Sequence, residues 1–320
     1  MEMSLPPADM NWKLKSAIQR TCARLPGGGE STYYFLQRSF GRMRRRPDSM
    51  PNLREASKLI AELRTLGFNL HGKRVMEVGT GRRLDMPLAF YLCGASSVLT
   101  YDLHPYLREE LVLGAIKTLA ANRAEVLELF APLTDADDLA KRFESLTKAT
   151  TLEMVLQIAK IVYRAPADAM KTGLADRSID LQFSYTVFEH IPEAVLEGIL
   201  IESNRILSSD GVACHHIDPS DHFAHVDGSI SFVNFLQFEE EEWKRYNDNQ
   251  FAYHNRLRVS DYEALYRRVD HRMLKWSTSL NERGMKEIES GALPLASPYK
   301  GVPVDVLATC VVRAVSQPKR

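Results

Sequence analysis

Two acids and two glycines in the first third of the chain have the spacing of a ligand-binding turn. Glu77 ends a short apolar, β-branched run, and Gly79 and Gly81 follow it before an apolar, helix-like segment that begins at Leu84. Glycine suits such a turn because a ligand can approach its backbone closely and because it reaches positive φ without strain. Asp102 follows Gly81 by about 20 residues at the end of another apolar run, where a carboxylate can accept hydrogen bonds from ribose hydroxyls.

The chemistry of this turn favours a ligand that carries no phosphate. A dinucleotide-binding turn has a third glycine, and Leu84 occupies that position here. Glu77, at the end of the predicted strand, would repel a phosphate and attract an ammonium group. An amino acid joined to a nucleoside fits the turn and both acids.

A second group of residues that could do chemistry follows an apolar run at 212–217. It contains four histidines and two aspartates: His215, His216, Asp218, Asp221, His222 and His225. A divalent metal could bind here and acidify a substrate hydroxyl, or the histidines could act as bases, contact a substrate, or fill a polar wall. Strand alternation sends His215 and His216 to opposite faces, which disfavours a compact four-histidine cage. We therefore predict substrate contact or proton transfer without a metal.

These segments resemble the motifs of class I, Rossmann-like S-adenosylmethionine-dependent methyltransferases. The resemblance continues, in order, through residues 167–169, 178–185 with 188–191 behind them, and 204–207 leading to Gly211, so that it spans roughly residues 70–217. It implies S-adenosylmethionine as cofactor and an acid, Asp168, at the adenine amino group. The cofactor contacts that it implies are Glu77, Val78, Gly79, Thr80, Gly81, Asp102, Leu103, Asp168, Ala169 and Tyr185.

The expected fold is α/β, with a doubly wound, seven-stranded and mostly parallel sheet that ends in an antiparallel hairpin. Its last two strands are predicted around 272–277 and 305–315. Residues 1–70 are predicted to form an N-terminal helical cap, and residues 71–320 the methyltransferase domain. Two insertions are expected, a helical one near 107–158 and an aromatic, polar one near 219–258.

The predicted activity is methyl transfer to a small-molecule acceptor, at oxygen or nitrogen. A protonated nucleophile needs a base, and the candidates are His190, His216, His222 and His225. One alternative is a non-catalytic binding module with the methyltransferase fold, which the intact acids and glycines disfavour. Another is a nicotinamide-dependent oxidoreductase, which Glu77 and Leu84 oppose.

Composition limits the kinds of partner that the chain is expected to bind. The 320 residues include 41 Lys and Arg and 41 Asp and Glu, so no net field would steer the chain to nucleic acid. No apolar run approaches the roughly 18 residues that span a bilayer, and four scattered cysteines suggest a reducing compartment. We therefore expect a cytoplasmic protein with neither nucleic-acid nor membrane partners; a homodimer is left open. A basic cluster at Arg42–Arg46 is typical of a solvated helix end, or of a contact with an anionic substrate.

Overall fold

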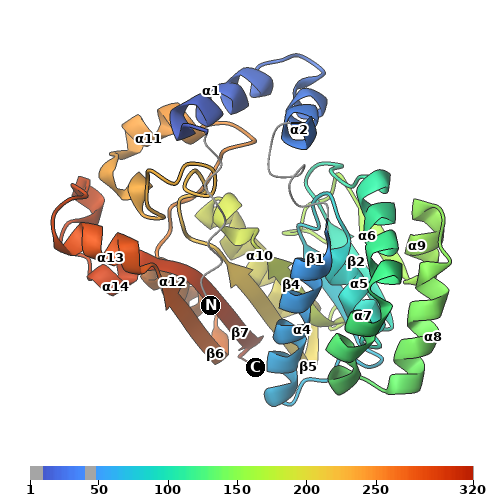
Figure 1. The fold of residues 1–320 in the computed structure, drawn as a ribbon. Coiled ribbons are helices and arrows are strands. Elements are labelled where there is room, and N and C mark those ends of the chain that lie inside the picture. Colours follow the sequence, from blue (N-terminus) through green and yellow to red (C-terminus); the bar gives the residue numbers. More distant parts are fainter. Residues whose placement is uncertain (1–9, 40–47, 320) are drawn as a thin grey trace.

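A computed structural model describes residues 10–39 and 48–319, and the basic cluster Arg42–Arg46 lies outside these ranges. Its centre is a seven-stranded sheet with the order β3-β2-β1-β4-β5-β7-β6 (Figure 1). The strands are β1 (Arg74–Val78), β2 (Ser97–Tyr101), β3 (Ile161–Arg164), β4 (Ile179–Tyr185), β5 (Leu207–Ile217), β6 (His271–Leu280) and β7 (Thr309–Pro318). The first five pair in parallel, whereas β7 runs antiparallel to both of its neighbours. The predicted fold class is confirmed.

Each central strand sends alternate side chains into two cores. Val75 of β1 packs in one core and Met76 in the other, and both are fully buried. In the same way Cys214 and Ala213 of β5 belong to opposite cores. A parallel sheet covered on both faces needs this pattern, which explains why its strands are almost continuously apolar.

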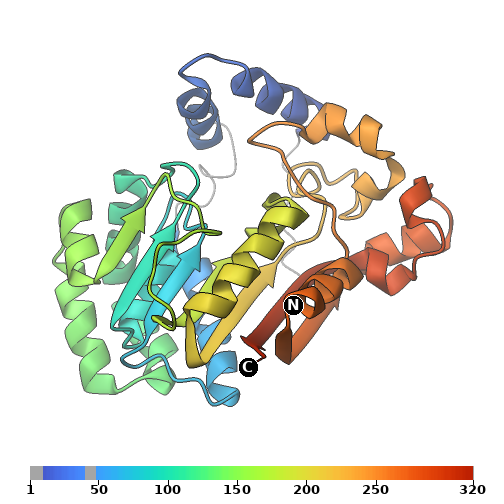
Figure 2. The same cartoon turned by 180° about the vertical axis from the view of Figure 1, so that it is seen from behind.

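Helices cover both faces of the sheet (Figures 1 and 2). One core takes residues from α4 (Met50–Thr65), α5 (Asp85–Leu92), α6 (Glu109–Ala121), α7 (Arg123–Phe130), α8 (Ala136–Thr147) and α9 (Leu152–Ile158). The other core takes residues from α10 (Glu193–Ile206) and α12 (Val259–Arg268). Although α4 lies within the predicted cap, its apolar face is part of the main core. Within the described ranges, no helix is both long and apolar enough to cross a membrane.

The end of the chain differs in detail from the prediction. Residues 305–308, expected in the last strand, belong to the short helix α14 (Val304–Ala308), and β7 begins at Thr309. Pro303 caps this helix, and its fixed φ suits the entry into a helix. Helix α13 (Glu282–Glu289) lies between β6 and α14 along the chain. The strands β7 and β6 complete the sheet beyond β5.

Two helices lie over one end of the sheet: α1 (Trp12–Ala23) and α2 (Gly29–Ser39) (Figures 1 and 2). Trp12 is buried in a third apolar cluster with Phe223 and Trp243, and Trp243 belongs to α11 (Glu240–Asn247). The Trp12 backbone N–H also donates to the Asp227 carboxylate at 2.9 Å. Helix α1 is therefore attached to the aromatic insertion that was predicted near 219–258.

Helix α2 is attached instead to the loops that follow β1 and β2. Glu30 accepts a hydrogen bond from Arg82 at 3.0 Å and another from Arg108. Both guanidinium groups also lie over the Tyr34 ring, at 5.0 and 4.9 Å from its centroid. Through α1 and α2, the amino-terminal segment connects the first strands of the sheet with the insertion.

We predict that Glu30→Ala loosens α2 without unfolding the protein. Partly exposed ion pairs contribute about 0–1 kcal/mol each, so the melting temperature should change by less than about 4 °C. Hydrogen exchange of residues 29–39 should nevertheless become several-fold faster, because two of the ion pairs that hold α2 depend on this carboxylate. Glu144→Ala, which removes the exposed pair with Arg123, is the matched control. Unchanged exchange in α2 would contradict this role of Glu30.

Candidate functional site

The glycine turn packs directly against the exit of β4. Gly79 has φ +80°, and a side chain there would meet both terminal methyl carbons of Val187 at 2.7 Å. Gly81 has φ +69° and free space around it. Glycine is therefore favoured at this position by the backbone conformation alone and not by lack of room for a side chain. The Gly81 N–H donates to the Asp102 carboxylate at 3.0 Å. The ends of β1 and β2 are therefore joined through two of the predicted site residues.

Two buried carboxyl groups lie at this turn. Burial, with a smaller contribution from nearby Asp102 and Asp85, raises the pKa of Glu77 to about 8, although the Thr80 hydroxyl donates to it. Burial also raises the pKa of Asp102 to about 6, against the opposing effect of the Gly81 N–H. A carboxyl group in such surroundings gains most from a cationic or hydrogen-bonding partner. The turn thus fits a ligand with an ammonium group and hydroxyls.

The other predicted cofactor contacts differ in how deeply they are buried and in the residues that they contact. Val78 is buried in the core, whereas the Leu103 side chain is 68% exposed just after Asp102. The loop with Asp168 and Ala169 is joined to β2, because the Ala167 N–H donates to the Asp102 carbonyl at 2.9 Å. The exposed Asp168 carboxylate accepts from the Met170 N–H at 2.8 Å. Tyr185, at the end of β4, stacks on His216 with ring centroids 4.6 Å apart.

The chain leaves β4 through a strained residue. Thr186 has φ +52°, which is rare for a β-branched residue, and its N–H donates to the His216 carbonyl at 2.8 Å. After it, the chain forms a 3₁₀ turn, η2 (Phe188–His190), that places Glu189 and His190 beside the segment after β5. Strained backbone persists where the surrounding structure fixes it, and such residues cluster at functional sites.

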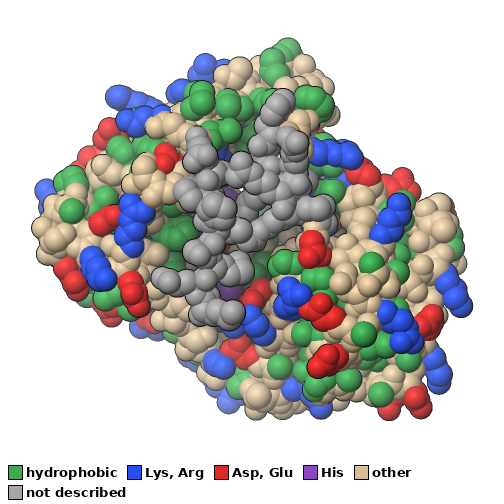
Figure 3. All heavy atoms as spheres, viewed as in Figure 1, with side chains coloured by type: hydrophobic (Ala, Val, Ile, Leu, Met, Phe, Trp, Pro, Cys, Tyr) green, Lys and Arg blue, Asp and Glu red, His purple; other side chains and the backbone are tan. Residues whose placement is uncertain are grey.

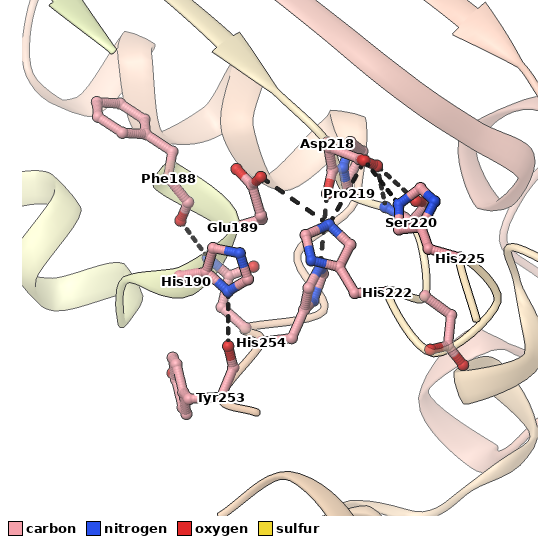
Figure 4. A network of polar contacts seen from close by, with 12 residues as sticks. Phe188, Glu189, His190, Asp218, Pro219, Ser220, His222, His225, Tyr253 and His254 are labelled. Carbon is pink, nitrogen blue, oxygen red and sulfur yellow. Dashed lines mark hydrogen bonds and ion pairs between the residues drawn. The ribbon is translucent and has the colours of Figure 1, made fainter. Parts of the chain in front are cut away.

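Histidines from three segments meet at this point (Figure 4). The ring centroids of His190, His222 and His254 lie 4.8–5.9 Å from one another, and His225 lies 5.2 Å from His222. Asp218, just past β5, accepts from the His225 ring at 3.4 Å and lies 3.5 Å from the His222 ring. Histidine side chains are visible in the middle of the face seen in Figure 3. Three of the four predicted catalytic histidines are therefore brought together.

The fourth, His216, lies elsewhere, within β5 itself, and its side chain points to the face opposite that of His215. His216 accepts a hydrogen bond from Arg313 at 3.2 Å and stacks on Tyr185. His215 is fully buried on the other face, bonded to the Ser184 hydroxyl at 2.8 Å and stacked on Phe188. Burial lowers the pKa of His215 to about 3 and that of His216 to about 4, so both are neutral at pH 7.

Two members of the cluster are not among the predicted site residues. Glu189 is fully buried, and within the described ranges no side chain donates a hydrogen bond to its carboxylate. The nearest ring nitrogen is Nε2 of His222, 4.0 Å from Oε1. His254 comes from the insertion and reaches the Asp218 carbonyl at 3.4 Å. Glu189 directly precedes a predicted catalytic residue in the sequence, whereas nothing in the sequence signals that His254 folds back onto the turn.

Several solved structures resemble this chain at low sequence identity. No protein-family model and no curated protein sequence matches the chain. A candidate sarcosine dimethylglycine methyltransferase from Galdieria sulphuraria has 13% identity and TM-score 0.44, with 82% of this chain and 85% of that chain covered. An S-adenosylmethionine-dependent methyltransferase from Mesorhizobium loti has 14% identity and TM-score 0.40, with coverage of 80% and 95%. The [4+2]-cyclase SpnF has 11% identity and TM-score 0.43, with coverage of 83% and 81%.

The sheet itself has the form that the sequence resemblance implied. Five parallel strands in the order 3-2-1-4-5, followed by an antiparallel β7 and an outer β6, are typical of class I S-adenosylmethionine-dependent methyltransferases. The carboxyl ends of β1, β2 and β4 carry the glycine turn, Asp102 and η2. In open α/β sheets of this kind, ligands bind outside the carboxyl ends of the strands.

We predict that Glu77→Gln stabilises the protein in the absence of ligand. Because the pKa of Glu77 is raised to about 8, its contribution to stability is lost as the pH rises through that value. Glutamine keeps an acceptor for Thr80 but cannot ionise. At pH 8.5 the variant should melt at least about 2 °C above the wild type, with a smaller difference at pH 6. Scanning fluorimetry at both pH values tests this, with the exposed Glu144→Gln as control. A lower melting temperature for Glu77→Gln at both values would contradict it.

Proposed function

We propose that the protein is an S-adenosylmethionine-dependent methyltransferase that acts on a small-molecule acceptor. One observation carries the proposal: the hydrogen-bonded set at the ends of β1 and β2. In this set Thr80 donates to Glu77, and the Gly81 N–H donates to Asp102 at 3.0 Å. Two buried acids on a glycine turn match a ligand that has an ammonium group at one end and ribose hydroxyls at the other.

The residues fit the cofactor piece by piece. Glu77 would attract the ammonium group of the methionine moiety, and Asp102 would accept hydrogen bonds from the ribose hydroxyls. Leu103, with its exposed apolar side chain beside Asp102, would pack against the adenine ring. Asp168, on the loop joined to Asp102, would accept from the adenine amino group. A pyrophosphate fits poorly, because the buried Glu77 would face its charge.

When bound, S-adenosylmethionine supplies a methyl group already activated on a sulfonium sulfur. The chain must then hold the acceptor in line with that group and exclude water, and such positioning contributes about 7–11 kcal/mol in favourable cases. His190 can accept a proton if the acceptor is a hydroxyl or a protonated amine. Burial and the neighbouring His222 lower the pKa of His190 to about 4, so its ring is neutral. Its Nδ1–H donates to the Tyr253 carbonyl at 2.8 Å, which leaves Nε2 as the accepting nitrogen.

We predict that S-adenosylmethionine binds the wild type and that Asp102→Ala weakens this binding by about 10- to 100-fold. The factor corresponds to the roughly 1.5–3 kcal/mol of a hydrogen bond to a charged group. Titration calorimetry measures both affinities, and Asp137→Ala, on the exposed side of α8, is the control. Equal binding by wild type and Asp102→Ala would remove this acid from the site. Formation of S-adenosylhomocysteine on incubation with a small-molecule extract tests turnover, and binding without turnover would favour a non-catalytic module.

Cofactor affinity should also depend on pH. Since the pKa of Glu77 is about 8 in the free protein, pairing with an ammonium group requires this residue to lose its proton. The association constant should therefore rise between about pH 6 and pH 8, by at most about tenfold per pH unit for each proton released. At pH 7 the measured enthalpy should vary with the ionisation enthalpy of the buffer. Glu77→Gln should bind more weakly and without that variation. A wild-type affinity that is flat over this pH range would exclude Glu77 as the ammonium partner.

A further inference from the structure

The cluster at the end of β4 and β5 offers a set of metal-binding atoms. Two trios of side chains each place one donor atom per residue within 4.8 Å of the others: Glu189, His190 and His222 form one, and Asp218, His222 and His225 the other. The shared member contributes the same atom, because Nε2 of His222 lies 4.0 Å from Glu189 Oε1 and 3.5 Å from Asp218 Oδ2. Figure 4 shows these side chains pointing toward one another from two separate segments.

The spacing is suitable for a transition metal. Ligand atoms that each lie about 2.1 Å from one ion are about 3–4.2 Å apart, depending on whether they are adjacent or opposite. The distances from His222 Nε2 to the two carboxylates fall within this range, as does the 3.4 Å between His225 Nε2 and Asp218 Oδ2. Mixed imidazole and carboxylate donors are typical of Mn²⁺, Fe²⁺ and Zn²⁺.

Glu189 supplies an independent observation. Its side chain is completely buried, and within the described residues no side chain donates a hydrogen bond to its carboxylate, which only the backbone N–H groups of Glu189 and Asp218 approach. A buried carboxylate without a cationic partner is strongly unfavourable, and nearby Asp218 adds repulsion of like charge. A cation between these two acids would remove both penalties. Within the described parts of the chain, no lysine or arginine forms an ion pair with either acid.

The surrounding residues orient the donors as metal sites commonly do. A metal-binding histidine usually donates its other ring N–H to a carbonyl or carboxylate, as His190 does to the Tyr253 carbonyl at 2.8 Å. One oxygen of Asp218 accepts from the Ser220 N–H at 3.1 Å, which leaves the other toward the histidines. His254 has partners at both nitrogens, the Asp218 carbonyl at 3.4 Å and the Arg256 N–H at 3.2 Å, so it supports the cluster without being a ligand.

We propose that Glu189, Asp218 and His222, completed by His190 and His225, bind one divalent first-row transition metal ion. A single ion follows because one imidazole nitrogen can coordinate only one metal. The two carboxylates balance its charge. The prediction of no metal rested on His215 and His216 pointing to opposite faces, which they do, but the structure builds this cluster without either of them.

The site lies close to the glycine turn in space. Val187, two residues before Glu189, is the residue that packs against Gly79. An ion here would therefore bind an oxygen or nitrogen of the acceptor beside the cofactor. With His190 as a ligand, the ion would replace this ring in promoting loss of the acceptor's proton. This last step rests on the proposed function, whereas the metal site itself does not.

Metal binding is tested directly on the full chain, stripped with chelator and titrated calorimetrically with Mn²⁺ or Zn²⁺ alone. We expect one ion per chain for the wild type and for His71→Ala, an exposed histidine remote from the cluster. His222→Ala and Glu189→Gln should bind at least 100-fold more weakly. Absence of saturable binding of both ions to the wild type, or unchanged binding by the two cluster variants, would overturn the proposal.

If His222→Ala does not fold, the melting temperatures of the wild type and of Glu189→Gln, with and without metal, test the site. Added metal should raise the melting temperature of the wild type, because a ligand that binds only the native state stabilises it. Glu189→Gln has the same shape without the charge, so it should melt above the metal-free wild type and gain nothing from metal. A Glu189→Gln protein that still gains stability from metal would count against the site. Titration of the stripped wild type with S-adenosylmethionine separates a failure of this proposal from a failure of the proposed function.

Discussion

The burial of carboxyl groups at one edge of the sheet is the constraint on which the site depends. Glu77, Asp102 and Glu189 are each at most 5% exposed, and each lies at or just beyond the end of a parallel strand. Charged groups in such positions weaken a fold unless they are neutralised or paired. They can be held there because the strands behind them are packed into two apolar cores. The sheet thus holds buried carboxyl groups in place, and a ligand can offer them better hydrogen-bonding or charged partners than the protein does.

Helices α1 and α2 contact different parts of the molecule around the candidate site. Helix α2 is held by Arg82 and Arg108, which lie in the loops after β1 and β2. Helix α1 packs against the insertion, where the buried Arg258 donates to the carbonyls of Pro219 and Leu307. Pro219 follows Asp218 directly, so this arginine fixes the backbone beside the histidine cluster. The cap therefore connects the two groups of residues that the proposed reaction needs.

The features that depend on local sequence pattern could be predicted from the sequence. The strand, turn and helix around Gly79 and Gly81 follow from periodicity and glycine chemistry, and strand alternation correctly separates His215 from His216. Local pattern could not show that the 3₁₀ turn after β4 brings Glu189 beside His222, because residues more than 30 apart meet there only after β4 and β5 pair. Nor could it show that His254 returns to the same place, or that α4 packs in the core and not in the cap. In these cases tertiary contacts decide the position of a residue.

The insertion is what makes the strained turn after β4 possible. The Asn255 side chain donates to the carbonyls of Phe188 and Ile191, both at 2.8 Å, and its backbone N–H donates to the Glu189 carbonyl at 2.9 Å. These bonds hold η2 from one side, while the Thr186 N–H holds it from the β5 side. A residue in an unfavourable conformation persists when its neighbours fix it in this way. The same insertion contains His222, His225 and His254. One segment therefore both fixes the turn and provides most of the histidines in the cluster. Under the proposed function, residues 219–258 would contact the acceptor, and the ends of β1 and β2 would hold the cofactor.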